Sequence, residues 1–200
     1  MAVKYFTIEK ISKGLYKEKG SKFISIAYPV TNENQIKEII DLVKKEYHDA
    51  RHHCYAWRLG SDYKKYRYND DGEPSSTAGK PIFGQIQSFN LTDILIIVVR
   101  YFGGTKLGVS GLIKAYKEAA ADAINNNSII EKTVKQTFRL EFNYDNTNIV
   151  MRNLKADYID VINQEFNETC ILDFDVSIDK SDEIINKLNK IQNIKINKIK

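Results

Sequence analysis

Hydrophobic and polar positions in residues 1–126 follow two different periods. Alternation or a short continuous apolar run predicts strands, whereas apolar residues three and four apart predict amphipathic helices. On this basis we expect strands at 5–10, 22–30, 53–59 and 91–100, and helices at 32–47, 81–87 and 109–126. The run 94–99 is apolar throughout, so its strand should be buried on both faces. The helix at 109–126 should bury Leu112, Ile113, Tyr116, Ala119, Ala120 and Ala123. The segments 14–20 and 61–77 are expected to form turns.

The remaining residues repeat the same kinds of pattern in a different order. We expect strands at 134–144, 158–165, 169–178 and 194–198, with helices at 148–157 and 181–191. Strand, helix, strand, strand, helix, strand is the order of a ferredoxin-like βαββαβ domain. The predicted fold class is therefore α+β with two domains, an α/β sandwich over residues 1–130 and a ferredoxin-like domain over residues 131–200.

Composition supports this division. All 10 glycines and all 3 prolines lie between residues 14 and 111. A site built from loops is therefore expected in the first domain. The net charge is +4, and residues 1–130 hold 19 Lys and Arg against 14 Asp and Glu. Such an excess is compatible with an acidic partner such as RNA, and equally with a solvated basic surface.

The cysteines and the apolar segments indicate a cellular compartment. Cys54 and Cys170 form no closely spaced pair, which is typical of a reducing cytosol. The first residues contain no apolar signal core, and the six-residue run 94–99 is far shorter than the roughly 20 residues that span a bilayer. We expect a cytoplasmic protein without a membrane partner.

The histidines at 48, 52 and 53 could belong to a metal site or a nucleophilic site. His48, His52 and Cys54 could contribute to a zinc site, but no fourth ligand lies nearby in the sequence. Cys54 could also act as a nucleophile with His52, its neighbour on the same strand face. The alternatives are a helix-end cation at His48 and a buried strand cysteine, and they lead us to expect no metal and no cofactor.

The segment 69–80 is rich in acidic and hydroxyl side chains. Gly72 cannot be the glycine of an EF-hand calcium loop, because aligning it there would place Arg67 first and Ala78 last in the loop. The hydroxyls of Ser75, Ser76 and Thr77 could bind phosphate or cap the following helix, and capping is the stronger local expectation.

A glycine loop follows the apolar strand, at residues 101–108. It lacks the lysine of a P-loop and the spacing of a dinucleotide-binding loop. What remains is Arg100 and Lys106 flanking bare backbone amides, an arrangement that suits a phosphodiester or an acidic peptide. The alternative is that the glycines serve a sharp turn and close packing of helix on sheet.

Three segments in this order resemble the IMPACT/YigZ family. They read HCYAWRLG at 53–60, DDGEPSSTAGKP at 70–81 and RYFGGTKLG at 100–108, and SKFI at 21–24 resembles the family's N-terminal motif. The chain departs from the usual pattern where the family has glycine, isoleucine, alanine and glycine: these positions are Ser76, Thr105, Val109 and Ser110.

The resemblance implies both a fold and a role. The family's first domain is similar to domain IV of elongation factor G and to a domain of a small-subunit ribosomal protein, and its second domain to domain V of that factor. Eukaryotic relatives act in translational control through a longer chain.

We therefore expect a non-enzymatic, translation-associated regulator that binds RNA, the ribosome or a translation-related protein through a basic glycine-loop groove. The alternative is a small-molecule hydrolase or other enzyme that uses the acidic loop and the histidines. No catalytic residue is assigned, and the oligomeric state is left open. The expected binding residues are His53, Arg58, Asp70, Asp71, Glu73, Ser75, Thr77, Lys80, Arg100, Gly103, Gly104 and Lys106.

Overall fold

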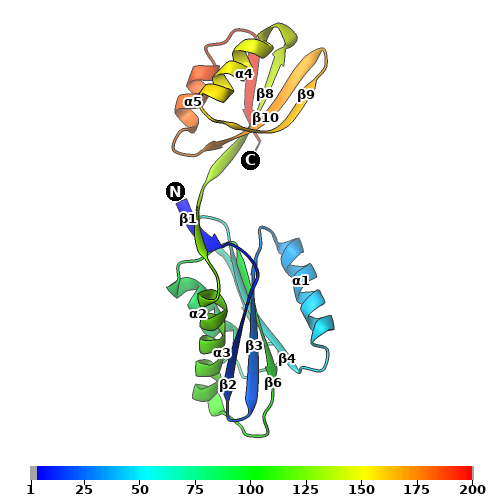
Figure 1. Ribbon diagram of the computed structural model, residues 1–200, viewed down its shortest axis with the longest axis vertical. Coiled ribbons are helices and arrows are strands. Elements are labelled where there is room, and N and C mark those ends of the chain that lie inside the picture. The colour runs from blue at the N-terminus through cyan, green and yellow to red at the C-terminus, as the bar shows by residue number, and fades with distance from the viewer. Residues whose placement is uncertain (1–3, 200) are drawn as a thin grey trace. The chain divides into compact units, whose positions relative to one another are not determined.

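The computed structural model describes residues 4–199, which divide between residues 132 and 133 into two compact units. Each unit packs around its own hydrophobic clusters, and the mixed α+β class predicted from the sequence is confirmed (Figure 1).

The first unit is built on a five-stranded sheet in the order β2-β3-β6-β4-β5. Its strands are β2 (Ser12–Glu18), β3 (Ser21–Pro29), β4 (His52–Leu59), β5 (Lys65–Asn69) and β6 (Ile94–Tyr101). The helices are α1 (Glu33–Glu46), α2 (Gly79–Ser88) and α3 (Gly108–Asn125). A separate two-stranded sheet pairs β1 (Lys4–Ile8) with β7 (Ile129–Thr133).

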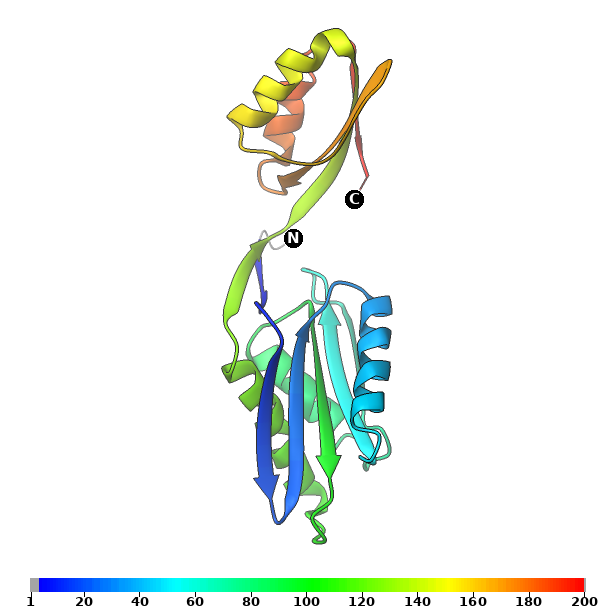
Figure 2. The ribbon, with the colours of Figure 1, turned by 45° about the vertical axis from the view of Figure 1, so that its right-hand side comes forward.

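Strand β6 is the centre of this unit and pairs antiparallel with β3 and β4. Its residues from Ile94 to Val99 are fully buried, as the apolar run predicted. Alternate side chains enter different clusters: Ile94, Ile96 and Val98 pack with α2 and α3, and Leu95, Ile97 and Val99 pack with α1. Both views show α1 on one face of the sheet and the other two helices on the opposite face (Figures 1 and 2).

Three strands in this unit, β2, β5 and β7, were not predicted, and β7 spans the boundary that we expected between the two domains. β2 lies where we expected only a turn, and it includes Gly14, where a Cβ would approach the backbone nitrogen of Ala123 to 2.5 Å. Because β2 packs this closely on α3, a glycine stands where an apolar side chain would otherwise mark the strand. β5 lies within the polar segment 61–77 and is exposed because it forms a sheet edge. The prediction that Ile113 is buried was also wrong, since 39% of this residue is exposed.

The second unit has the predicted βαββαβ order. Its elements are β8 (Lys135–Asn143), α4 (Thr147–Ala156), β9 (Asp160–Phe166), β10 (Thr169–Ser177), α5 (Ser181–Leu188) and β11 (Ile194–Lys198), with a 3-10 turn η1 (Tyr144–Asn146) before α4. The antiparallel sheet has the order β11-β8-β10-β9. Phe138, Leu140 and Phe142 alternate inward from β8 and form the centre of its core. The predicted ferredoxin-like topology is therefore confirmed.

Candidate functional site

Asp70 organises the acidic loop between β5 and α2. Its Oδ1 accepts hydrogen bonds from the backbone N–H groups of Ala78 (3.0 Å) and Gly79 (2.8 Å), and its Oδ2 accepts one from Ser76 (2.9 Å). These amides include the first donors of α2, which have no partner within the helix. Asp70 thus caps α2 although it lies eight positions before Ala78 in the sequence. Thr77 donates its hydroxyl to the carbonyl oxygen of Pro74 at 2.6 Å.

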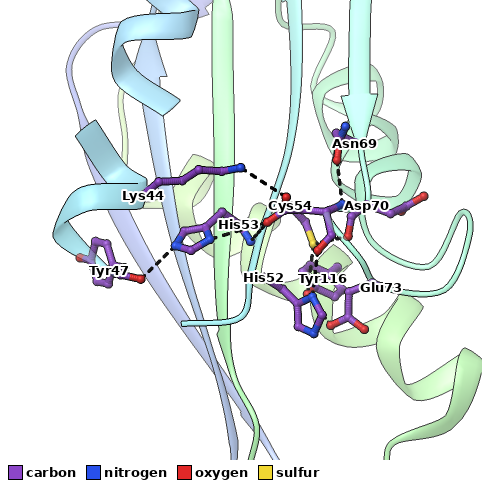
Figure 3. Close-up of polar contacts among 10 residues, drawn as sticks. Lys44, Tyr47, His52, His53, Cys54, Asn69, Asp70, Glu73 and Tyr116 are labelled. Carbon is purple, nitrogen blue, oxygen red and sulfur yellow. Dashed lines mark hydrogen bonds and ion pairs between the residues drawn. The ribbon is translucent and has the colours of Figure 1, made fainter. Parts of the chain in front are cut away.

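Asp71 joins the same loop to the start of β4 and to α1. Its Oδ2 accepts from the backbone N–H of His53 at 2.7 Å, and its Oδ1 lies 3.3 Å from Lys44 Nζ. The carbonyl oxygen of Asp71 accepts from His52 Nδ1 at 2.9 Å, and that of Tyr47 accepts from His53 Nε2 at 3.0 Å. Figure 3 shows the two imidazoles held by these contacts. Backbone carbonyls can only accept, so each named nitrogen carries its proton.

Glu73 lies at the centre of a buried polar group. Its Oε1 accepts from Arg100 Nη1 at 2.6 Å and from the Tyr116 hydroxyl at 2.8 Å. Cys54 Sγ lies 3.3 Å from the Tyr116 oxygen and donates to the carbonyl oxygen of Asp70 at 3.0 Å. Burial raises the pKa of the Cys54 thiol and of the Tyr116 phenol, so both stay protonated near neutral pH. The group ties β4, β6, α3 and the acidic loop together.

The glycine loop after β6 packs on the turn between β2 and β3. A Cβ on Gly103 would lie 1.9 Å from the backbone carbon of Gly20, and the Gly103 N–H donates to Ser21 Oγ at 3.1 Å. Gly104 and Gly108 have positive φ angles of 86° and 72°, with open space at the Cβ position. Close packing at Gly103 and turn geometry at the other two explain these glycines locally.

A hollow of about 600 Å³ opens beside this loop, at the ends of β4 and β6. Its lining includes Arg51 and His52 from the start of β4 and Arg100, Tyr101 and Phe102 from the end of β6. Asp49 also lines it and accepts from the Tyr101 hydroxyl at 2.7 Å. This hydrogen bond raises the pKa of Tyr101 to about 12. The hollow offers cationic and aromatic groups side by side.

The structure brings together five of the twelve residues expected to bind a partner. They are His53, Asp70, Asp71, Glu73 and Arg100, which belong to the connected contacts described above. Of the twelve, only Arg100 lines the hollow. Arg58 lies toward the far end of β4, where it donates to the carbonyl oxygens of Leu91 and Ile86. The exposed residues are Ser75, Lys80, Gly103, Gly104 and Lys106, whereas Thr77 is buried.

Arg51, Asp49 and Tyr116 are site residues that sequence reasoning missed. Tyr116 carries a hydroxyl on a helix face otherwise made of alanine, leucine and isoleucine, and such a polar group needs a buried partner. Arg51 precedes a strand rich in histidine, which was a usable signal. Among residues 4–199, no three His, Cys, Asp or Glu side chains are arranged to hold a metal ion, and no helix has the length and apolarity to cross a bilayer.

Residues 19–124, more than half of the chain, match the Impact N-terminal domain. The chain belongs to the IMPACT family. It is 34% identical over 140 residues to the IMPACT family member YvyE of Bacillus subtilis (strain 168), and 37% identical over 128 residues to YigZ of Escherichia coli (strain K12). These alignments cover 70% and 63% of this chain, and 64% and 63% of the relatives, just under two thirds of their lengths.

The fold is also found among solved structures. The crystal structure of a hypothetical protein superposes with a TM-score of 0.78 and 27% identity, over 100% of this chain and 99% of that one. Both units of the present structure are therefore included in the aligned region.

Proposed function

We propose that this protein is a non-enzymatic, translation-associated regulator that binds RNA. Membership of the family supports the link to translation, because the sequence resemblance implies translational control for its eukaryotic relatives. A cytoplasmic location belongs to the same proposal. The RNA-binding part rests on a surface that we call the basic end, made of Lys19, Lys22, Arg51, Phe102 and Lys106.

The basic end carries the proposal because one packing contact assembles it. The approach of Gly103 to Gly20 holds the glycine loop, with Phe102 and Lys106, against the turn that bears Lys19. Lys22 pairs with Tyr101 across β3 and β6, and Arg51 immediately precedes β4 on the other side of β6. Figures 1 and 2 show the β2–β3 turn and the loop after β6 at the same end of the sheet.

The chemistry of this end suits a nucleic acid. Its four cations are exposed, so they can neutralise phosphates and release counterions. The Phe102 side chain, in a residue that is 59% exposed, offers a face on which a base can stack. Arg100 contributes less charge than the sequence suggested, because Glu73 offsets it. The protonated Cys54 thiol and the internally paired Glu73 favour a binding protein over a hydrolase at this site.

The test is binding of the full chain to purified ribosomes and to single-stranded RNA, by co-sedimentation and fluorescence anisotropy. We expect binding that weakens as salt increases. A protein that binds neither ribosomes nor RNA at low salt would refute the proposal, and capture of a translation factor in the absence of RNA would replace it with a protein-binding role.

A further inference from the structure

Arg100, one of the residues that line the hollow beside Phe102, carries a buried donor that the protein itself leaves unused. The Arg100 side chain is 9% exposed, and its Nη1 is engaged by Glu73. Its Nε atom is buried and has no hydrogen-bond partner among residues 4–199. Buried polar groups almost always have a partner, so an unpaired Nε–H at a hollow points to a missing acceptor.

The groups around this donor define the acceptor. Arg51, which is exposed, lines the same hollow and adds a second cation. The centroid of the Phe102 ring lies 5.8 Å from the Arg100 guanidinium carbon, and both residues line the hollow. The edge of a guanidinium that includes Nε is well suited to bind a phosphate oxygen, and an adjacent exposed ring is suited to a base.

We infer that this hollow binds one phosphate group of a single-stranded RNA, with Arg100 and Arg51 as its ligands and Phe102 stacking on the adjoining base. The inference rests on the proposed RNA-binding function and assigns it a nucleotide site. Asp49, the carboxylate in the lining, is held by the Tyr101 hydroxyl, and its charge is partly compensated by that hydrogen bond. The exposed Phe102 ring can change rotamer to admit the phosphate.

The most direct readout is the arginine Nε–Hε region of a ¹⁵N correlation spectrum, since the chain has six arginines. Arg100→Lys assigns the Arg100 signal and keeps a cation opposite Glu73. We expect uridine 5′-monophosphate and inorganic phosphate to shift this signal, and uridine to leave it unchanged. A signal that neither phosphate compound moves would overturn the inference and leave a bound water as the occupant.

Substitutions then separate the two contacts. We expect Arg51→Gln to weaken binding of a short oligouridine about tenfold, and Phe102→Ala to do the same because a stacked base is lost. Arg67→Gln, an equal change at an exposed arginine on β5, serves as the control and should leave affinity unchanged. Phe102→Ala should weaken uridine monophosphate but not inorganic phosphate.

The outcomes distinguish this site from the broader function. If the chain binds RNA while Arg51→Gln and Phe102→Ala bind as the wild type does, RNA binding stands and the nucleotide site is wrong. If the Arg100 signal responds to uridine monophosphate while the chain binds no RNA, the RNA assignment is overturned and the hollow is a site for a free nucleotide.

Discussion

Arg100 Nη1 donates to Glu73 Oε1 at 2.6 Å, and the two side chains are 9% and 3% exposed. The pair connects the segment 100–108, which begins at the end of β6, to the acidic loop. It also explains why an arginine that the sequence places next to a glycine loop supplies little free charge there.

Removing one partner of this pair should destabilise the first unit strongly. Glu73→Ala leaves the Arg100 guanidinium buried without its carboxylate, so we expect a loss of about 3–5 kcal/mol. Trp57 is the only tryptophan and lies in this unit's core, so its fluorescence during urea unfolding measures the change. Glu33→Ala, which removes an exposed partner of Lys65, should cost less than about 1 kcal/mol. Equal losses for the two variants would contradict the buried role.

Neighbouring glycines should respond differently to alanine. Gly103→Ala drives a Cβ into the Gly20 backbone, which cannot move aside like a flexible side chain, so we expect a loss of at least about 2–3 kcal/mol. Gly104→Ala meets open space and should cost only about 1 kcal/mol for its positive φ. Urea unfolding of the two variants provides the comparison. A larger loss at Gly104 would mean that the glycine loop is not held by packing.

Ser76 occupies a position that favours glycine. Its φ is +62°, and it stands where the family usually has glycine. Ser76→Gly should therefore stabilise the first unit by about 0.5–1 kcal/mol, since its N–H can still donate to Asp70. Ser75→Gly, one residue earlier and without a positive φ, should be neutral or destabilising by up to about 1 kcal/mol. The Ser76 prediction fails if both substitutions have the same sign.

Burial of Cys54 should make stability fall at alkaline pH. The folded-state pKa of its thiol is raised, whereas the unfolded thiol ionises near pH ~8.5. Its contribution is therefore fully present below about pH 8.5 and is lost as pH rises above that value. Urea unfolding from pH 7 to pH 10 should show a steeper decline for the wild type than for Cys54→Ala. Parallel pH profiles would show that this thiol does not contribute.

A strong local pattern explains what could be predicted. β6 was recognised because its apolar run is continuous, and the second unit because its apolar residues alternate or recur at helical spacing. β2, β5 and β7 were not predicted, because Gly14 interrupts the pattern of β2 and because β5 and β7 are only five residues long. The alternation of Tyr66 and Tyr68 in β5 was a signal that sequence reasoning missed. The Asp70 cap joins residues 6 to 9 positions apart, and the Glu73–Arg100–Tyr116 group joins residues 27 and 43 positions apart. Neither set of partners can be assigned from a local sequence pattern.

The central claim is that the basic end binds single-stranded RNA, and its salt dependence tests that claim most directly. Lys22→Gln combined with Lys106→Gln removes two proposed phosphate contacts. The control, Lys37→Gln, removes one exposed lysine charge on α1, outside the basic end. We expect the double variant to lower the slope of log Kd against log salt by about 1.4, at roughly 0.7 per phosphate contact, and Lys37→Gln to leave it unchanged. A wild-type slope near zero, or the same slope in the wild type and the double variant, would contradict the account.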